Sequence, residues 1–552
     1  MRKIVLLVFI LSFVQLCNAQ TPQWLWAKYG LHTGYTEGIA ACNDTRGNTF
    51  LSGFFIGNTL VFGNTTLVNS DNTNSTFDIF IVKYDASGNL LWAKSAQGPS
   101  ADDWCYDMTC DTSGNVILTG FFRGSSITFG NVTLTHPGLF VVKFDGSGNV
   151  IWARDAIGNS ETRSITTDNN NNVLITGWFN TATLQLGNIT LTNGGNPSIK
   201  DYFVAKYDSS GTVLWAKKAG GIGHDQGMGI STDLVGNVFV TGDFKSATIS
   251  FGNTTLTNVN SDSIDVFVAK YDTDGNILWA KREGGTSSDG GHTISASPDG
   301  DAYVTGWYYS TSFQYGNNTL NRIGPWGNKD MFVAKYDTDG NVIWSKSVGS
   351  VYDVNAWSMV LDLSENIFIA GGYSGSVDFG AFNLISSGGI DPAFVVKYNS
   401  EGTEQCAFKL SSGGDDLLII FLDDFGNLFL GGDWGGASGI TGLPVVGLEN
   451  AFIAKFRFNC EPVAVNNSIT DDCFRIYPNP ATTHITIETN SQYPTSNNEC
   501  RIMNTMGQVV LHSTLDIRNS TFDISSISPG LYLLQVLDAK GELVRVVKMV
   551  KE

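Results

Sequence analysis

The sequence predicts an all-β protein: a seven-bladed β-propeller closed by an N-terminal strand, followed by a small immunoglobulin-like β-sandwich. Three observations predict this fold. A unit of short apolar runs and Gly, Asn and Asp turns recurs seven times along most of the 552 residues, as repeat architectures require. The piece that the last copy lacks stands alone near the start of the chain. The C-terminal residues leave the repeat but keep the alternation of strands.

The first residues have the pattern of a secretory signal peptide. Arg2 and Lys3 give a positive start, residues 4–16 form an apolar core, and small residues precede a cleavage site after Ala19. We therefore expect residues 1–19 to be removed and the protein to leave the cytoplasm. A lipoprotein anchored at Cys17 is the weaker alternative, because bulky Leu16 precedes that cysteine.

Composition narrows the range of partners. The formal net charge is −19 at pH 7, so DNA, RNA and anionic membranes, which bind basic surfaces, are not expected as partners. No later stretch is long and apolar enough to span a bilayer as a helix, which predicts no transmembrane anchor. Sixty-two glycines and few charged residues suit many short strands joined by turns.

The repeat is clearest in the hairpin of residues 332–346, Phe-Val-Ala-Lys-Tyr-Asp-Thr-Asp-Gly-Asn-Val-Ile-Trp-Ser-Lys. The glycine of its loop can take the positive φ that a short hairpin turn needs. The tryptophan of the second strand, replaced once by Cys406, recurs at Trp26, Trp92, Trp152, Trp215, Trp279 and Trp344. The lysine of the first strand recurs at Lys83, Lys143, Lys206, Lys270, Lys335, Lys397 and Lys455.

A second signature, Gly-Asn-Val-Phe-Val-Thr-Gly at residues 236–242, precedes each hairpin and ends at Gly53, Gly120, Gly177, Gly242, Gly306, Gly371 and Gly432. A third, Phe-Gly-Asn-Thr-Thr-Leu at residues 251–256, lies between the two. Each unit therefore holds four or five short strands, which is typical of a propeller blade. A linear β-solenoid is the rival fold, but its coils are usually much shorter than this unit.

The two ends of the repeat region complement each other. The seventh copy ends at residues 452–460 without its Trp strand, and residues 23–28, Gln-Trp-Leu-Trp-Ala-Lys, form such a strand alone. We expect the N-terminal strand to complete the last blade and close the ring, which removes an exposed sheet edge.

This alternation of Gly-Asn-Val-x-Val-Thr-Gly with Phe-Val-Ala-Lys-Tyr-Asp and Trp-Ala-Lys resembles the seven-bladed propeller repeat of bacterial secreted and cell-surface proteins. The resemblance covers roughly residues 24–458 and implies a propeller over residues 20–460. It implies almost nothing about function, because propellers host many unrelated activities.

After Cys460 the pattern changes. Residues 461–472 are interpreted as a linker, and residues 473–552 as six or seven short strands that suit a small β-sandwich. Four motifs stand out in this segment, at residues 477–480, 504–508, 528–532 and 544–551. The residues that carry them are Tyr477, Pro478, Asn479, Pro480, Gly507, Pro529, Gly530 and Lys548.

These motifs resemble the C-terminal sorting domain of type IX secretion substrates in Bacteroidetes-type bacteria. The resemblance implies that residues 473–552 engage the type IX machinery, which carries the protein across the outer membrane. The product would then be released to the medium or attached to the cell surface. An ordinary accessory sandwich is the alternative.

Seven cysteines remain after Cys17, an odd number. Cys42 and Cys110 occupy roughly matching places in neighbouring repeats, which predicts that they are separated rather than paired. Cys460 and Cys473 bracket the linker and are the favoured disulfide. No cysteine spacing matches a zinc site.

Acidic residues stand shortly before the second signature in every copy. If the strand that follows them is innermost, seven carboxylates would ring one mouth of a central channel and could concentrate cations or bind sugar hydroxyls. These candidate ligand-binding residues are Glu37, Asp103, Glu161, Asp225, Asp289, Asp353 and Asp415. The alternative is that each acid caps its own turn.

Other patterns favour structural roles. The lysines recur in every copy, whereas an active site normally breaks the symmetry, so we expect them to pack and pair within blades. The loops at Asp272 and Asp337 resemble the start of a calcium loop but lack its distal glutamate, so hairpin turns are favoured and calcium stays an alternative. No other cofactor is expected. Trp104, Trp326 and Trp357 lie in or near loops and could pack in a blade or stack on sugar rings.

Motifs of known enzymes are missing from the sequence, which has no G-x-S-x-G elbow, HExxH or P-loop. His224 and His292 lie beside the acidic loops, but one His–Asp neighbour pair is weak support for acid–base chemistry. We therefore predict no catalytic residue and an exported binding, adhesion or scaffold module for an extracellular glycan or protein. The alternative is a carbohydrate-active enzyme, a lyase or glycosidase, using carboxylates at the channel mouth. A structural matrix component is a third hypothesis.

Overall fold

The computed structural model describes residues 23–70, 75–99, 101–325, 327–386, 392–410, 418–423, 426–434, 450–457, 474–477, 481–489, 498–504, 509–515, 519–537 and 543–551. Every regular element in these ranges is a β-strand, so no helix among them could cross a membrane. The chain divides into two compact units, Met1–Cys460 and Glu461–Glu552. The expected signal peptide, residues 1–19, and the expected linker, residues 461–472, lie outside the described residues.

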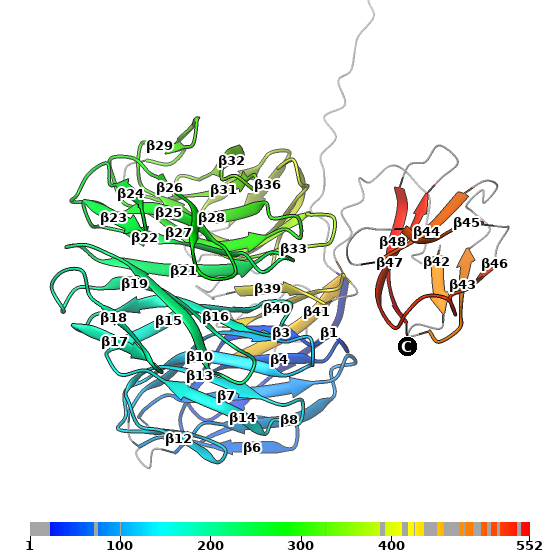
Figure 1. Ribbon diagram of the computed structural model, residues 1–552, viewed down its shortest axis with the longest axis horizontal. Helices are drawn as coiled ribbons and strands as arrows, with labels where there is room; N and C mark the ends of the chain where they lie inside the picture. Colours follow the sequence, from blue (N-terminus) through cyan, green and yellow to red (C-terminus); the bar gives the residue numbers. More distant parts are fainter. Residues whose placement is uncertain are drawn as a thin grey trace, which may run out of the picture. The chain divides into compact units, whose positions relative to one another are not determined.

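The first unit is built from four-stranded antiparallel sheets, seven among the described residues, each with the same strand order (Figure 1). The first strands are β3 (Tyr35–Asn43), β9 (Asp103–Cys110), β15 (Ser160–Thr167), β21 (Asp225–Thr232), β27 (Asp289–Ala296), β33 (Val354–Leu361) and β39 (Leu418–Leu422). The second strands are β4 (Thr49–Ile56), β10 (Val116–Phe122), β16 (Val173–Phe179), β22 (Val238–Phe244), β28 (Ala302–Tyr308), β34 (Ile367–Tyr373) and β40 (Leu428–Trp434).

The outer half of each sheet follows the same order. The third strands are β7 (Asp78–Tyr84), β13 (Gly138–Phe144), β19 (Asp201–Tyr207), β25 (Asp265–Tyr271), β31 (Asp330–Tyr336), β37 (Ala393–Tyr398) and β41 (Asn450–Arg457). The fourth strands are β8 (Leu90–Ser95), β14 (Val150–Asp155), β20 (Val213–Ala219), β26 (Ile277–Glu283), β32 (Val342–Val348), β38 (Glu404–Lys409) and β1 (Gln23–Tyr29).

The sheets form a closed ring. Each first strand contacts the first strand of the next sheet, from β3 through β9, β15, β21, β27 and β33 to β39, and β39 contacts β3. The first strands are therefore innermost, and each sheet is one blade of a β-propeller. The propeller prediction is confirmed.

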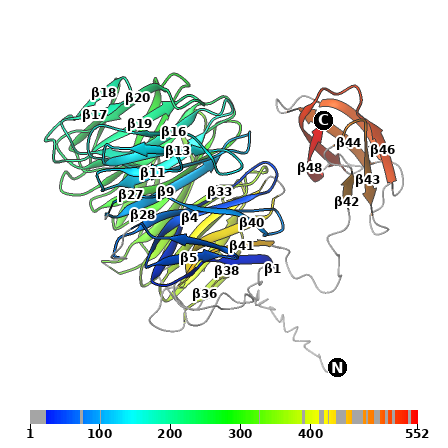
Figure 2. The ribbon, with the colours of Figure 1, turned by 90° about the horizontal axis from the view of Figure 1, so that it is seen from below.

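The ring closes between the two ends of the repeat region. Strand β1, dark blue in Figures 1 and 2, lies beside the yellow β41 and pairs with it antiparallel. In that pairing Trp26 lies opposite Lys455, as Trp92 lies opposite Lys83 in the first blade. Because the N-terminal strand takes the outermost place of the last blade, the predicted closure is confirmed.

The third sequence signature forms two-stranded ribbons apart from the blades. They are β5 (Thr59–Phe62) with β6 (Thr65–Val68), β11 (Ile127–Phe129) with β12 (Val132–Leu134), β17 (Thr183–Leu186) with β18 (Ile189–Thr192), β23 (Thr248–Phe251) with β24 (Thr254–Thr257), β29 (Ser312–Tyr315) with β30 (Asn318–Asn321), and β35 (Ser376–Phe379) with β36 (Phe382–Ile385). The short β2 (Leu31–His32) adds to β5.

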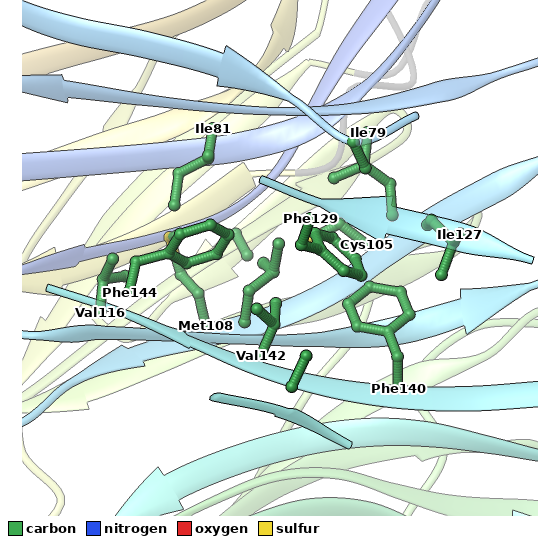
Figure 3. Packing of buried hydrophobic residues seen from close by; sticks show 14 of the residues in the cluster. Ile79, Ile81, Cys105, Met108, Val116, Ile127, Phe129, Phe140, Val142 and Phe144 are labelled. Atoms are coloured by element: carbon green, nitrogen blue, oxygen red, sulfur yellow. The ribbon is translucent and has the colours of Figure 1, made fainter. Parts of the chain in front are cut away.

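The hydrophobic core lies between the blades. The second and third strands are buried along almost their whole length, which explains their continuous apolar runs. Figure 3 shows one such interface, in which Ile79 and Ile81 of one blade pack with Met108, Phe129 and Phe140 of the next. Fully burying side chains of this size contributes about 1.5–3 kcal/mol each.

The repeated tryptophan fastens each blade to the next. Its indole nitrogen donates a hydrogen bond of 3.0–3.2 Å to a turn carbonyl of the following blade, in the pairs Trp26–Ala86, Trp92–Gly146, Trp152–Ser209, Trp215–Thr273, Trp279–Thr338 and Trp344–Ser400. Gly340 of the hairpin turn has φ 79°, and a Cβ there would lie 2.7 Å from the Trp279 ring. The turn therefore needs glycine both for its backbone and for this contact.

The repeated lysines are structural. Five of them form ion pairs with acids of the turn between the first and second strands, at N–O distances of 2.8–3.3 Å. The pairs are Lys83–Asp44, Lys143–Asp111, Lys206–Asp168, Lys335–Asp301 and Lys455–Asp423. Most of these groups are buried, so each charge depends on its partner.

One cysteine prediction is wrong. Cys42 and Cys110 form a disulfide, with their Cα atoms 6.1 Å apart. They lie on β3 and β9, innermost strands of neighbouring blades that contact each other, so matching places on these strands are close rather than separated. Cys406 is also disulfide-bonded, while Cys105 is free and buried. The favoured Cys460–Cys473 pair lies outside the described residues.

The second unit contains two sheets. One has β42 (Phe474–Tyr477), β43 (His484–Thr489) and β46 (Asn519–Asp523), and the other has β44 (Asn498–Asn504), β45 (Val509–Leu515), β47 (Gly530–Leu537) and β48 (Leu543–Lys551). Ile485 and Ile487 of the first sheet share a core with Ile502, Leu534 and Met549 of the second. Two sheets around one apolar core form a small β-sandwich.

Candidate functional site

Three of the predicted acids begin innermost strands. Asp103, Asp225 and Asp289 are the first residues of β9, β21 and β27, and all three are buried. Asp225 accepts hydrogen bonds from Gly221 N at 3.0 Å and from Ser246 Oγ at 2.6 Å. Asp289 has the same environment in the next blade, with bonds from Gly285 N and Ser310 Oγ. Because they brace loops, Asp225 and Asp289 resemble turn caps rather than ligand-binding groups. Asp103 differs from them, since one of its carboxylate oxygens has no hydrogen-bond partner among the described residues.

A second acid adjoins each of these three, and both acids of each pair are buried. Burial, with a smaller contribution from the neighbouring Asp201 and Asp265, raises the pKa of Asp225 and Asp289 to about 7. Burial raises the pKa of Asp103 to about 8, with Asp78 adding to the effect. Hydrogen bonds to the charged form act in the other direction but do not overcome desolvation.

The remaining predicted acids occupy other positions. Glu37 is half-buried in β3, accepts a 2.8 Å hydrogen bond from the Tyr35 hydroxyl, and has its pKa raised by burial. Asp353 precedes β33 and accepts a hydrogen bond from Lys329 N at 3.0 Å. Asp415 lies outside the described residues. The described acids therefore occupy three different positions along their strands, and Glu161 alone belongs to the cluster described next.

A β-bulge brings one extra residue into six of the innermost strands. The bulged residues are Ile39, Tyr106, Arg163, Met228, His292 and Trp357. Bulges twist a strand and re-aim one side chain. The type of residue differs in every blade, whereas the packing residues around it repeat.

Arg163 lies at the middle of a group that we call the central cluster: Tyr106, Glu161, Arg163, Trp178, Lys200, Gln226, Asp243 and His292. Its guanidinium contacts Glu161 Oε2 at 3.2 Å and lies 4.5 Å from the centre of the Tyr106 ring. The Tyr106 hydroxyl lies 3.4 Å from the same Glu161 oxygen. These three side chains come from β9 and β15, so they join two blades.

Lys200 directly precedes β19, in the blade of Arg163, and Asp243 on β22 extends the cluster to the next blade. The Lys200 ammonium lies 4.1 Å from the centre of the Trp178 ring, and burial, together with Arg163, lowers its pKa. Asp243 accepts a 3.2 Å hydrogen bond from Gln226. Burial raises the pKa of Asp243 to about 6, against the hydrogen bond and the nearby Lys200 and Arg163.

His292 completes the cluster. Burial lowers its pKa to about 4, and the positive charges of Arg163 and Lys329 act in the same direction, so the imidazole is neutral at pH 7. Lys329 lies before β31 with its ammonium 5.8 Å from the centre of the Trp307 ring. The cluster can therefore offer cations, aromatic rings and neutral hydrogen-bonding groups together.

The sequence pointed to Glu161 and His292, but not to Arg163, Lys200, Trp178 or Asp243. A usable signal existed for two of them. Trp178 and Asp243 each follow the final glycine of the second signature, and the register places them opposite Glu161 and Gln226. That place varies from copy to copy within an otherwise repeated motif, and such variation marks a position that packing alone does not fix.

The other candidates have structural environments. The carboxylates of Asp272 and Asp337 accept hydrogen bonds from their own turns, and no group of three metal-ligating side chains occurs within the described ranges; calcium binding stays a prediction. Trp104 packs among Phe54, Phe77 and Phe121. His224 accepts a hydrogen bond from Lys200 N. Trp357 packs against Gly372, and Trp326 lies outside the described residues.

The residues of the sorting motifs fall partly within the second unit's sheets. Tyr477 ends β42 opposite Thr486, Gly530 begins β47 after the exposed Pro529, and Lys548 lies opposite Leu533 in β48. The Tyr532 hydroxyl donates to the Ser528 carbonyl at 2.8 Å, which fixes the turn that precedes β47. Pro478, Asn479, Pro480 and Gly507 lie outside the described residues.

Comparison with known proteins gives a family for the second unit. Residues 475–552 match the family of secretion system C-terminal sorting domains. A WD repeat-containing protein of Acanthamoeba polyphaga mimivirus, itself uncharacterised, is 26% identical over 71% of this chain, but the chain spans only 34% of that relative. A regulatory protein of Caulobacter vibrioides is 30% identical over 26% of this chain and 14% of its own length.

Solved structures match the chain only weakly. The type IX secretion surface component PorZ of Porphyromonas gingivalis has 10% identity and a TM-score of 0.20, covering 94% of this chain and 82% of PorZ. An ulvan lyase has 11% identity and a TM-score of 0.38, covering 75% of this chain and 92% of the lyase. The family match, not these low scores, assigns the tail: this chain is a β-propeller protein that carries a type IX secretion C-terminal sorting domain and is exported to the cell surface or medium.

Proposed function

We propose that this chain is an exported binding module whose propeller holds an extracellular ligand at the central cluster. The observation that carries the proposal is the contrast between the cluster and its scaffold. The lysine, tryptophan and glycine of the blades recur with nearly the same contacts, whereas the cluster joins unlike side chains from successive blades. A function needs one asymmetric site, and packing in a symmetric ring does not.

Binding fits this arrangement better than catalysis. Asp103, Asp225 and Asp289 are the acids that a carbohydrate-active enzyme would have used, and all three are buried. Asp225 and Asp289 also brace loops through their hydrogen bonds. An enzymatic role would therefore have to rest on Glu161 and Asp243. Glu161 is engaged by Arg163 and Asp243 by Gln226.

The test uses the full mature chain, residues 20–552, with a panel of plant, algal and bacterial polysaccharides and extracellular matrix proteins. Binding is measured by co-sedimentation and by calorimetry, and cleavage by release of reducing and unsaturated sugars. We expect saturable binding without products. Release of products would favour the enzymatic alternative, and failure to bind any member of the panel would favour a structural matrix component.

A further inference from the structure

The cations of the central cluster differ from those of the scaffold. Five of the repeated lysines have a carboxylate partner within 3.3 Å. Lys200 of the cluster lies against the ring of Trp178, and Lys329, which lies near the cluster, lies against the ring of Trp307. Neither forms an ion pair with a carboxylate of the described residues. Aromatic rings hold an ammonium group in place without neutralising it.

Arg163 is only partly satisfied. One terminal nitrogen contacts Glu161 and the guanidinium plane stacks on Tyr106, while its Nε has no hydrogen-bond partner among the described residues. The indole nitrogen of Trp178, a buried residue, also has no hydrogen-bond partner among the described residues. Arg163 is itself one of the cations, and Trp178 packs against the ammonium group of Lys200.

The charges of the cluster balance only while Asp243 is ionised. Arg163 and Lys200 are its two cations, and Glu161 and Asp243 are its two acids. Burial raises the pKa of Asp243 to about 6, so this acid is the first to lose its charge as the pH falls. Lys329 adds a positive charge near His292, although Asp353 accepts a hydrogen bond from the Lys329 backbone nitrogen. In a chain of net charge −19, this gathering of cations favours an anionic ligand.

Neutral polar groups adjoin these cations. His292 is uncharged at pH 7, because burial and the two neighbouring cations lower its pKa, and Gln226 presents an amide beside Asp243. Neutral donors and acceptors of this kind suit hydroxyl groups. A bare inorganic anion would use only the cations, whereas an acidic sugar would use both kinds of group.

We infer that the central cluster recognises a saccharide that carries carboxylate or sulfate groups. Arg163 and Lys200 contact the anionic group, and His292 and Gln226 contact its hydroxyls. This inference rests on the proposed binding function and names its ligand class. An acidic polypeptide is the competing occupant, and it lacks the hydroxyl groups that the neutral side chains match.

Matched probes test the ligand class on the mature chain. Dextran sulfate is compared with dextran, and polygalacturonate with its methyl ester, so that each pair differs in charge alone; poly-L-glutamate supplies carboxylates without sugar. We expect at least about tenfold tighter binding of one or both anionic polysaccharides than of their neutral counterparts. The two anionic arms tell whether sulfate or carboxylate is preferred.

Two variants locate the site. R163Q and K200Q each remove one positive charge of the cluster, and K217Q removes one on β20, an outermost strand, as the matched control. We expect each cluster variant to lose about fivefold or more in affinity and the control to bind as the wild type does. Thermal unfolding verifies that each variant is folded. If R163Q does not fold, K200Q alone tests the site.

Several outcomes would overturn the inference. Equal binding of dextran and dextran sulfate would refute the role of charge while leaving a binding function in place. Poly-L-glutamate binding as tightly as the polysaccharides would indicate a protein ligand. Wild-type affinity in folded K200Q and R163Q would place the site elsewhere, and failure of every probe and panel member would refute the proposed function as well.

Discussion

Single buried charges decide much of the stability of each blade. Lys206 and Asp168 are both buried and lie 2.9 Å apart. Although burial opposes it, hydrogen bonds from Lys206 and Asn172 lower the pKa of Asp168, so the carboxylate is ionised and depends on its lysine. Asp168 also accepts two backbone hydrogen bonds from its turn, which links the ion pair to the turn's shape.

Replacing Lys206 with methionine should therefore be costly. The change leaves the Asp168 charge buried without its partner, and we expect the free energy of unfolding to fall by about 3 kcal/mol. Urea denaturation measures this free energy of unfolding. The K217M variant, which removes a lysine from an outermost strand, is the control and should shift stability by no more than about 0.5 kcal/mol. A K206M protein as stable as the control would contradict the structural role of the repeated lysines.

Asp243 should make ligand binding depend on pH. Its neighbours are Lys200, Arg163 and Gln226, Glu161 lies near Lys200, and His292 stays neutral above its pKa of about 4. Protonation of Asp243 as the pH falls through about 6 increases the net positive charge of the cluster. We expect affinity for the anionic polysaccharide to rise about threefold from pH 7.5 to pH 5, the effect of roughly 0.7 kcal/mol.

The D243N variant is the matched control for this pH dependence, since its amide stays neutral throughout. It should bind at pH 7.5 as tightly as the wild type binds at pH 5, with a flatter profile, when both are measured by calorimetry. A steeper rise in D243N than in the wild type would show that another group titrates.

The sequence predicted the scaffold residues well and the site residues poorly, for a physical reason. Lys206 and Trp215 could be counted as repeats because every blade needs the same contact. Arg163 and His292 face their partners only because each is the extra residue of a bulge, and a bulge leaves no sequence motif here. Lys200 meets Arg163 because β15 and β19 belong to one sheet although they lie far apart in the chain, which no local pattern contains.

At the scale of elements, the innermost strands are where neighbouring blades come nearest. The Cys42–Cys110 disulfide ties β3 to β9 across this line and joins residues 68 apart in the chain. The blades and the closing strand β1 could be predicted from the sequence repeat. The disulfide could not, because the spacing of a repeat shows which residues occupy equivalent positions but not how far apart those positions lie in the folded ring.

Removing this disulfide should destabilise the propeller without unfolding it. The C42A/C110A variant restores chain freedom to a long loop of the unfolded state, and we expect a loss of about 2–4 kcal/mol. The thermal midpoint of the double variant is compared with that of C105A, which removes a free buried thiol. Reductant alone is not a substitute, since Cys406 is also bridged. Midpoints that match the wild type would refute a stabilising role.

At the scale of the whole molecule, buried acids between blades set how stability varies with pH. The folded pKa values are about 8 for Asp103 and about 7 for Asp225 and Asp289, above their ordinary value of 3.8. Such groups stabilise the fold fully below pH 4, and that contribution is lost as the pH rises through 7 to 8. Asp85 and Asp208 act oppositely, because hydrogen bonds in their turns lower their pKa.

We therefore expect the propeller to be most stable in mildly acidic solution. The thermal midpoint should fall by at least about 2 °C between pH 6 and pH 9, measured by differential scanning calorimetry. A D225N/D289N variant, if folded, should show a shallower decline, because two of the titrating groups are gone. A midpoint that is constant or rises over this range would contradict the assignment of these acids.

The pairing of β1 with β41 also sets the order of events in the life of the chain. The strand that leaves the ribosome first, residues 23–29, has as its partner residues 450–457, nearly the last of the propeller to be made. Until that partner appears, no ring can close, and the early blades stay in an open arc with unpaired edges. Closure of the ring therefore has to wait until nearly all of the propeller has been synthesised.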